Sequence, residues 1–275
     1  MKKILVPTDF TSVADVAIHY ASSLSKSLQS EVQLLHVVKK ASDIEEANQK
    51  LEAQAARHRA ESNYDLKYTT KVGNIFDDIA AVAKEEKAEL VVMGTHGLQG
   101  LQYLVGSNAL RVVAENSAPM IIVQGKSKVD ATVKRLLLPL DLHKDTKQKL
   151  KTAVEIAKRY NSEVHIIAPK ESDEFLHNQI ARNVSYAEGF MEQNKIVYKT
   201  KFTTASSSGF VKELLMYAAH TEIDLICILN NTDEQLIHAF GIDKEQKIIT
   251  NESQIPVMIL NPASTYIDDR SIFSQ

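Results

Sequence analysis

The chain has 275 residues, of which 44% are hydrophobic and 24% charged, and its formal net charge is -3. This length suits one large domain or two ordinary ones, and the composition excludes collagenous and low-complexity chains. The slightly acidic net charge argues against nucleic acid as the main partner, and the apolar runs are too short to span a membrane. The chain has one cysteine, Cys227, which excludes a disulfide framework. We therefore expect a cytoplasmic protein.

Short apolar runs alternate with longer amphipathic stretches in the first half of the chain. The short runs predict buried strands at Ile4–Val6, Val32–Val38, Tyr68–Val72, Leu90–Met93 and Met120–Val123. The longer stretches predict helices at Ser12–Ser27, from a capping box at Ser42 and Glu45 towards Ser62, at Phe76–Glu86 and at Ser107–Asn116. Strands that are apolar on both faces and alternate with helices predict an α/β fold with a parallel sheet covered on both sides.

The second half of the chain repeats the first. Residues 3–9 recur as 135–141, and residues 31–35 recur as 163–167, both 132 positions later. Two further matches, of 79–93 with 214–228 and of 118–123 with 255–260, follow in the same order at slightly larger offsets. We therefore expect two tandem domains, at residues 1–126 and 133–262, followed by a C-terminal tail at 263–275.

The residues that follow the predicted strands of the first copy suggest a ligand site. Ligands of parallel sheets bind beyond the carboxyl ends of the strands. Asp9 follows the first strand, and its carboxylate could accept hydrogen bonds from ribose or a base amine, or hold Mg²⁺. A glycine loop starting at Gly94 follows the fourth strand, and Gly106-Ser107 then opens a helix whose N-terminus suits phosphate. The glycine spacing of this loop matches neither the Gly-x-x-x-x-Gly-Lys-Ser/Thr motif nor the Gly-x-Gly-x-x-Gly motif of common nucleotide-binding proteins. The alternative is that the loop is a tight turn that binds no ligand.

Several of these segments resemble the universal stress protein family. The resemblance rests on residues 3–9, 34–37, 91–97, 106–107 and 118–123, and it extends more faintly over the second copy. It implies two tandem Rossmann-like domains, each with a five-stranded parallel sheet. It also implies binding of ATP or another adenine nucleotide by Pro7, Thr8, Asp9, Val37, Met93, Gly94, His96, Gly97, Gly106, Ser107 and Asn108.

The glycine loop departs from the family pattern in two ways. Eight residues separate Gly97 from Gly106, where the family pattern has nine. No lysine or arginine lies between Gly94 and Asn108, so a triphosphate would rely on backbone N–H groups and a metal ion such as Mg²⁺.

The second copy diverges at the corresponding loop. Asp141 matches Asp9, but Leu229, Thr232 and Ile242 stand where the first copy has Gly94, Gly97 and Ser107. Asp233 and Glu234 add negative charge that repels phosphate. We expect a degenerate second domain with a structural or regulatory role, in an intramolecular pseudo-dimer that could form a further homodimer.

The histidines and the cysteine have ordinary structural interpretations. We expect His96 to line the site without catalytic function, His36 to be packed or capped, and Cys227 to pack as a small hydrophobe. No Cys/His spacing predicts a metal site. The leading hypothesis is a nucleotide-binding stress or signalling module that is not an enzyme, and its protein partner is not predicted. A slow ATPase or nucleotidyl transferase and a scaffold that binds no nucleotide are the alternatives.

Overall fold

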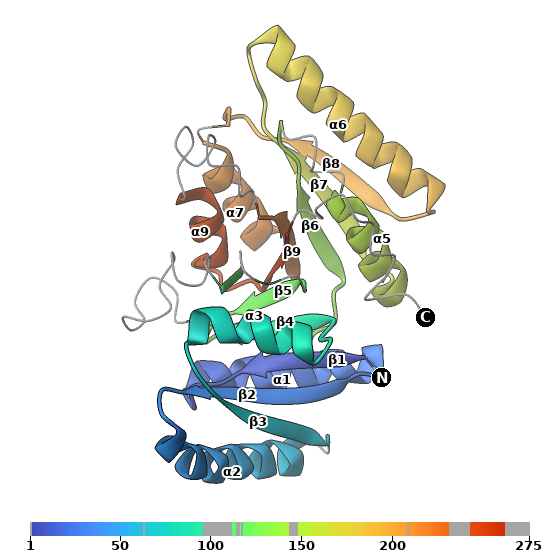
Figure 1. The fold of residues 1–275 in the computed structure, drawn as a ribbon. Coiled ribbons are helices and arrows are strands. Elements are labelled where there is room, and N and C mark those ends of the chain that lie inside the picture. The colour runs from blue at the N-terminus through green and yellow to red at the C-terminus, as the bar shows by residue number, and fades with distance from the viewer. Residues whose placement is uncertain are drawn as a thin grey trace. The chain divides into compact units, whose positions relative to one another are not determined.

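The computed structural model of the chain describes residues 2–62, 64–95, 112–113, 116, 118–142, 148–207, 209–230 and 243–261 (Figure 1). Contacts within the chain divide it into two compact units, Met1–Ala131 and Thr132–Gln275. Each unit contains strands and helices in alternation along the chain.

The described strands of the first unit form a parallel sheet. Their order across the sheet is β3-β2-β1-β4-β5. The strand bounds are Lys3–Pro7 for β1, Glu31–Val38 for β2, Leu66–Val72 for β3, Leu90–Gly94 for β4 and Met120–Val123 for β5. The prediction of an α/β fold with a parallel sheet is confirmed, and all the strands predicted in this half are present.

Burial along the strands follows their place in the sheet. Residues 4–7 of β1 and all of β5 are buried, and α1 packs against both strands. The outer strand β3 is polar, and of its residues only Leu66 is buried. The core of the unit therefore lies around β1 and β4, and the site is built at their ends.

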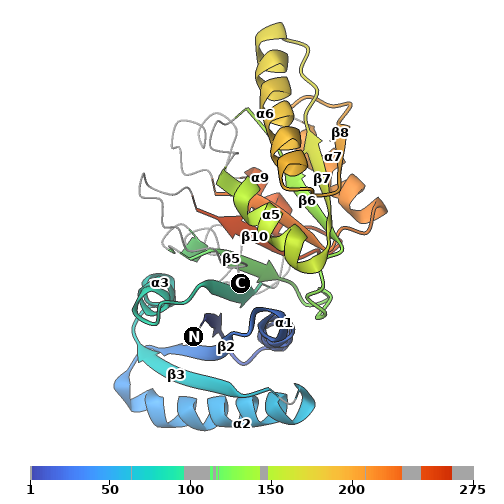
Figure 2. The same cartoon turned by 90° about the vertical axis from the view of Figure 1, so that its right-hand side faces the viewer.

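Three described α-helices connect the strands of this unit. α1 and α3 lie on opposite faces of the sheet (Figure 1 and Figure 2). Their bounds are Ser12–Leu28 for α1, Ile44–Ser62 for α2 and Ile75–Glu85 for α3. The predicted fourth helix, Ser107–Asn116, lies largely outside the described residues.

The predicted capping box at Ser42 is wrong. Ser42 lies inside a short 3-10 helix, η1 (Ala41–Asp43), and α2 begins after it at Ile44. The Ser42 hydroxyl donates a hydrogen bond to Asp43 Oδ1 over 2.9 Å. The side chain therefore bonds to its neighbour along η1 and does not cap the N-terminus of α2.

The described strands of the second unit are also parallel and have the order β8-β7-β6-β9-β10. Their bounds are Arg135–Pro139 for β6, Glu163–Ala168 for β7, Tyr198–Phe202 for β8, Leu225–Leu229 for β9 and Val257–Leu260 for β10. The helices are α5 at Gln148–Tyr160, α6 at Glu174–Gln193, α7 at Phe210–His220 and α9 at Asp243–Ile249. The strands of the second unit therefore have the same order across the sheet as the corresponding strands of the first unit.

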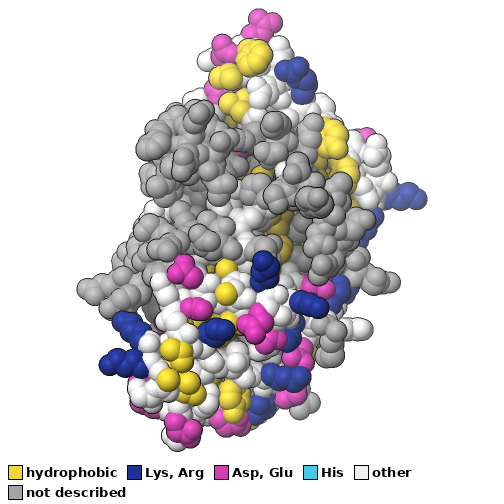
Figure 3. All heavy atoms as spheres, viewed as in Figure 1, with side chains coloured by type: hydrophobic (Ala, Val, Ile, Leu, Met, Phe, Trp, Pro, Cys, Tyr) yellow, Lys and Arg dark blue, Asp and Glu magenta, His cyan; other side chains and the backbone are white. Residues whose placement is uncertain are grey.

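The face of the first unit that Figure 3 shows carries charges of both signs. Basic and acidic side chains alternate over its described residues. Within the described ranges, no helix combines the length and apolarity needed to cross a bilayer.

Candidate functional site

A pocket lies at the carboxyl ends of β1 and β4. In this sheet β2 and β3 lie on one side of β1, and β4 and β5 lie on the other, so the strand order reverses between β1 and β4. Such a reversal opens a crevice between the loops that leave the two strands. The pocket is lined by Pro7, Thr8, Asp9, Ala14, Leu35, Val37, Ile75, Ile79, Met93 and Gly94.

The structure brings together part of the predicted site. The pocket contains Pro7, Thr8, Asp9, Val37, Met93 and Gly94. The other predicted residues lie outside the described residues: His96, Gly97, Gly106, Ser107 and Asn108.

Four pocket residues were not predicted from the sequence. Ala14 comes from the first turn of α1 and Leu35 from β2, whereas Ile75 and Ile79 are one helical turn apart on α3. The spacing of Ile75 and Ile79 predicts an apolar helix face. This pattern does not distinguish residues that line a pocket from residues that pack only in the core.

The turn between β1 and α1 is held by Asp9 and Thr11. Asp9 Oδ1 accepts hydrogen bonds from the Thr11 backbone N–H over 3.1 Å and from the Thr11 hydroxyl over 2.6 Å. Thr11 Oγ1 in turn accepts from Ala14 N and caps α1. Asp9 is exposed, and Oδ2 gives its carboxylate the capacity to accept further donors.

Phe10 has an unusual backbone conformation in this turn. Its φ is 65°, a value that is rare for a residue with a side chain and that marks local strain. The Phe10 ring packs on His36, with 4.4 Å between the ring centroids. The Nδ1–H of His36 donates to the Thr8 carbonyl over 2.7 Å, so His36 caps the backbone of the turn. These contacts fix the edge of the pocket.

Gly94, the last residue of β4, packs closely against the first turn of α1. A Cβ atom at this position would lie 2.6 Å from the Val13 carbonyl oxygen and 2.8 Å from Val13 Cγ1. Only glycine therefore lets the first turn of α1 pack against the end of β4. The sequence predicts that a loop starts at Gly94, but Gly94 is still the last residue of β4, and α1 occupies the space beside it.

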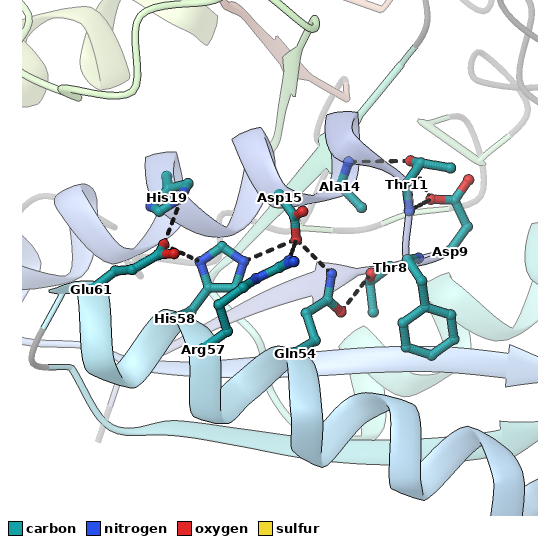
Figure 4. Close-up of polar contacts among 11 residues, drawn as sticks. Thr8, Asp9, Thr11, Ala14, Asp15, His19, Gln54, Arg57, His58 and Glu61 are labelled. Carbon is teal, nitrogen blue, oxygen red and sulfur yellow. Dashed lines mark hydrogen bonds and ion pairs between the residues drawn. The ribbon is translucent and has the colours of Figure 1, made fainter.

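Behind the pocket, Thr8 leads into a polar network between α1 and α2 (Figure 4). The Thr8 hydroxyl donates to Gln54 Oε1 over 3.0 Å, and Gln54 Nε2 donates to Asp15 Oδ1 over 2.8 Å. The same Asp15 oxygen accepts from Arg57 over 2.5 Å and from His58 Nε2 over 2.9 Å. Burial raises the pKa of Asp15, but the hydrogen bonds from His58 and Gln54 and the charge of Arg57 outweigh burial, so the pKa is lowered and Asp15 is ionised.

The pocket combines apolar side chains with a hydrogen-bond acceptor. The apolar side chains of Val37, Ile75 and Met93 can cover a planar base, and Asp9 can accept hydrogen bonds from hydroxyl groups. The exposed Asp9 carboxylate could also contribute to a Mg²⁺ site.

Comparison with known proteins identifies the family. Residues 1–124 match the model of the universal stress protein family. Universal stress protein MJ0531 of Methanocaldococcus jannaschii is 30% identical over 143 residues, which cover 46% of this chain and 84% of that protein. The chain belongs to the universal stress protein family. A second universal stress protein of the same organism, MJ0577, is 27% identical over 157 residues, covering 46% of this chain and 96% of that protein.

A solved universal stress protein extends the likeness to both units. The structure from Archaeoglobus fulgidus DSM 4304 aligns with 95% of this chain and 98% of its own chain, with a TM-score of 0.73 and 18% identity. This similarity shows that the α/β fold of the universal stress proteins is shared over nearly the whole chain.

Proposed function

We propose that the first unit of this universal stress protein binds an adenine nucleotide, with ATP as the leading candidate, and that the second unit has a structural or regulatory role. The observation that carries the proposal is the pocket at the β1–β4 crevice, where apolar side chains face Thr8 and Asp9. Open parallel sheets bind their ligands at this kind of crevice.

The described half of the pocket suits the base and ribose. Its lining combines apolar side chains with two polar ones, Thr8 and Asp9, which is typical of small-molecule sites. The base would lie against Val37, Ile75 and Met93, and the ribose hydroxyl groups would donate to Asp9. Because Asp9 Oδ1 is already oriented by Thr11, the carboxylate is ordered before ligand binds.

The phosphates would be bound by the loop that follows Gly94. This part of the proposal rests on the sequence, in which Gly97 and Gly106-Ser107 follow β4 and no basic residue accompanies them. Backbone N–H groups and Mg²⁺ would supply the positive charge. Gly97→Val, which adds a branched side chain in this loop, is expected to weaken ATP binding at least ten-fold, or about 1.4 kcal/mol.

The experiment compares two aspartates in equivalent positions. Asp9→Ala removes the predicted ribose acceptor, whereas Asp141→Ala removes the aspartate that follows β6 in the second unit. Isothermal titration with ATP and Mg²⁺ is expected to show at least about ten-fold weaker binding for Asp9→Ala and no change for Asp141→Ala.

A second variant tests the pocket without changing the turn that contains Asp9. Val37→Trp fills the pocket from β2 without touching the Asp9–Thr11 contacts, and it should also weaken binding. Circular dichroism checks that both variants are folded. Unchanged ATP affinity in folded Asp9→Ala and Val37→Trp proteins would refute the proposal.

A further inference from the structure

A second group of chemically active side chains lies outside the nucleotide pocket, between α1 and α2. It consists of His19 on α1 and of His58 and Glu61 on α2 (Figure 4). One potential ligand atom from each residue lies within 4.8 Å of the others. Glu61 Oε2 is 3.4 Å from His19 Nε2 and 3.9 Å from His58 Nδ1. The two imidazoles and the carboxylate thus converge on one small volume.

The helices place these side chains by ordinary spacing. His58 and Glu61 are three residues apart, so they lie on the same face of α2. His19 faces them from α1, and its ring centroid is 4.5 Å from that of His58 in an edge-on arrangement. The convergence therefore requires both helices to be packed as they are in the folded unit.

Asp15 fixes the orientation of the His58 ring and determines which ring nitrogen carries the hydrogen in their contact. The Asp15 carboxylate is paired with Arg57 and only accepts hydrogen bonds, so the hydrogen in its 2.9 Å contact with His58 lies on Nε2. In neutral His58 the lone pair is then on Nδ1, the nitrogen that faces Glu61. A carboxylate behind a histidine is the usual arrangement by which proteins orient a metal-binding imidazole.

The three side chains differ in how far they are exposed and so in their freedom to move. The His58 side chain is 1% exposed and held in place, whereas those of His19 and Glu61 are 35% and 49% exposed and can adjust. The positive charge of Arg57 is paired with Asp15 on the far side of the His58 ring.

We propose that His19 Nε2, His58 Nδ1 and a Glu61 carboxylate oxygen bind one divalent transition-metal ion, Zn²⁺ by preference, with water as a further ligand. Two imidazoles and one carboxylate form a donor set typical of Zn²⁺, whereas Mg²⁺ and Ca²⁺ prefer oxygen ligands. Ligand atoms in a tetrahedral Zn²⁺ site are about 3.3 Å apart, so rotation of the exposed His19 and Glu61 side chains would close the site. The ion would link α1 to α2.

The test titrates Zn²⁺ into the metal-free full chain, without nucleotide, in competition with a chromophoric chelator. We expect one tight site per chain, and at least ten-fold weaker binding in His19→Gln and in Glu61→Gln. Both variants change partly exposed side chains, so they should fold normally. The matched control is His220→Gln, which removes an exposed histidine at the end of α7 and should bind Zn²⁺ like the unchanged protein.

Co²⁺ provides a second readout, because its visible spectrum reports the coordination geometry. The unchanged protein should show the absorption of four-coordinate Co²⁺, and the His58→Gln variant should lose it. Failure of the full chain to bind Zn²⁺, or equal binding by the unchanged protein and by folded His19→Gln and Glu61→Gln variants, would overturn the proposal. Because nucleotide is absent throughout, this result is independent of ATP binding in the pocket.

Discussion

Thr8 and Gln54 connect the pocket to the second helix. The Thr8 hydroxyl donates to Gln54 Oε1 over 3.0 Å, although the two residues are 46 positions apart in the sequence. Gln54 is 6% exposed, and its amide nitrogen continues the contact to Asp15 on α1. One buried side chain of α2 therefore holds both the turn after β1 and the first half of α1.

Replacement of Gln54 by leucine should destabilise the protein and disturb the pocket. Gln54→Leu leaves the buried Thr8 hydroxyl without its acceptor and removes one donor from Asp15, a loss of about 1–3 kcal/mol. Urea unfolding measures this change. Gln49→Leu on the exposed side of the same helix is the control and should change the unfolding free energy by less than about 0.5 kcal/mol. Equal effects of both substitutions would contradict the role of Gln54.

Gly94→Ala should be strongly destabilising because its Cβ would lie 2.6 Å from the Val13 carbonyl oxygen. Relief of this overlap requires α1 to move from β4, and we expect a loss of about 1–3 kcal/mol in urea unfolding. Gly189→Ala in α6 makes the same chemical change where a Cβ would meet nothing within 4 Å. That variant should be as stable as the parent or more stable by up to about 1 kcal/mol. A harmless Gly94→Ala would show that α1 and β4 are not in close contact.

Cys227 should be unreactive in the folded protein. Its side chain is buried in β9, and burial raises the pKa of the thiol to about 12. Since the thiolate is the reactive form, an aromatic disulfide reagent at pH 8 should label the native chain very slowly and the urea-unfolded chain at once. Because the chain has one cysteine, the absorbance reports this site alone. Rapid labelling of the native protein would contradict the buried position.

The hydrogen bonds that Glu213 accepts predict that the folded protein becomes less stable in acid. Its carboxylate accepts from the Thr204 hydroxyl and from the backbone N–H groups of Thr204 and Ala205. Hydrogen bonds from Thr204 are the largest cause of its lowered pKa, below the ordinary value of 4.5. A depressed pKa gives stability that is complete above the unfolded-state value and is lost as the pH falls through the folded-state value.

The comparison of the parent with Glu213→Gln tests this dependence. The difference in unfolding free energy should be present at pH 7 and should shrink as the pH falls below about 4.5. A difference that stays constant down to pH 3 would show that the Glu213 charge is not involved.

The helices and strands that could be predicted are those whose apolar residues follow a pattern within a short stretch of sequence. Strands such as β1 and β4 are continuous apolar runs between polar segments, and the apolar face of α1 repeats at the helical period. Asp9 could be selected because a parallel sheet brings the carboxyl ends of its strands to one edge. These inferences need no knowledge of distant contacts.

Other features depend on contacts between segments that are far apart in the sequence. His19 and His58 meet only when α1 packs on α2, and no spacing pattern predicts that pair. The reason for glycine at position 94 lies in Val13, on another element. Ser42 matched a local capping pattern, but the chain entered α2 through a 3-10 turn instead.

The most direct measurement of the central claim is the number of ATP molecules bound per chain. Equilibrium dialysis of the nucleotide-free full chain with labelled ATP and Mg²⁺ would give this number at saturation. A site in the first unit and a degenerate second copy predict one ATP per chain, lost in Asp9→Ala and kept in Asp141→Ala. Two per chain would contradict the degenerate second copy, and none would contradict nucleotide binding altogether.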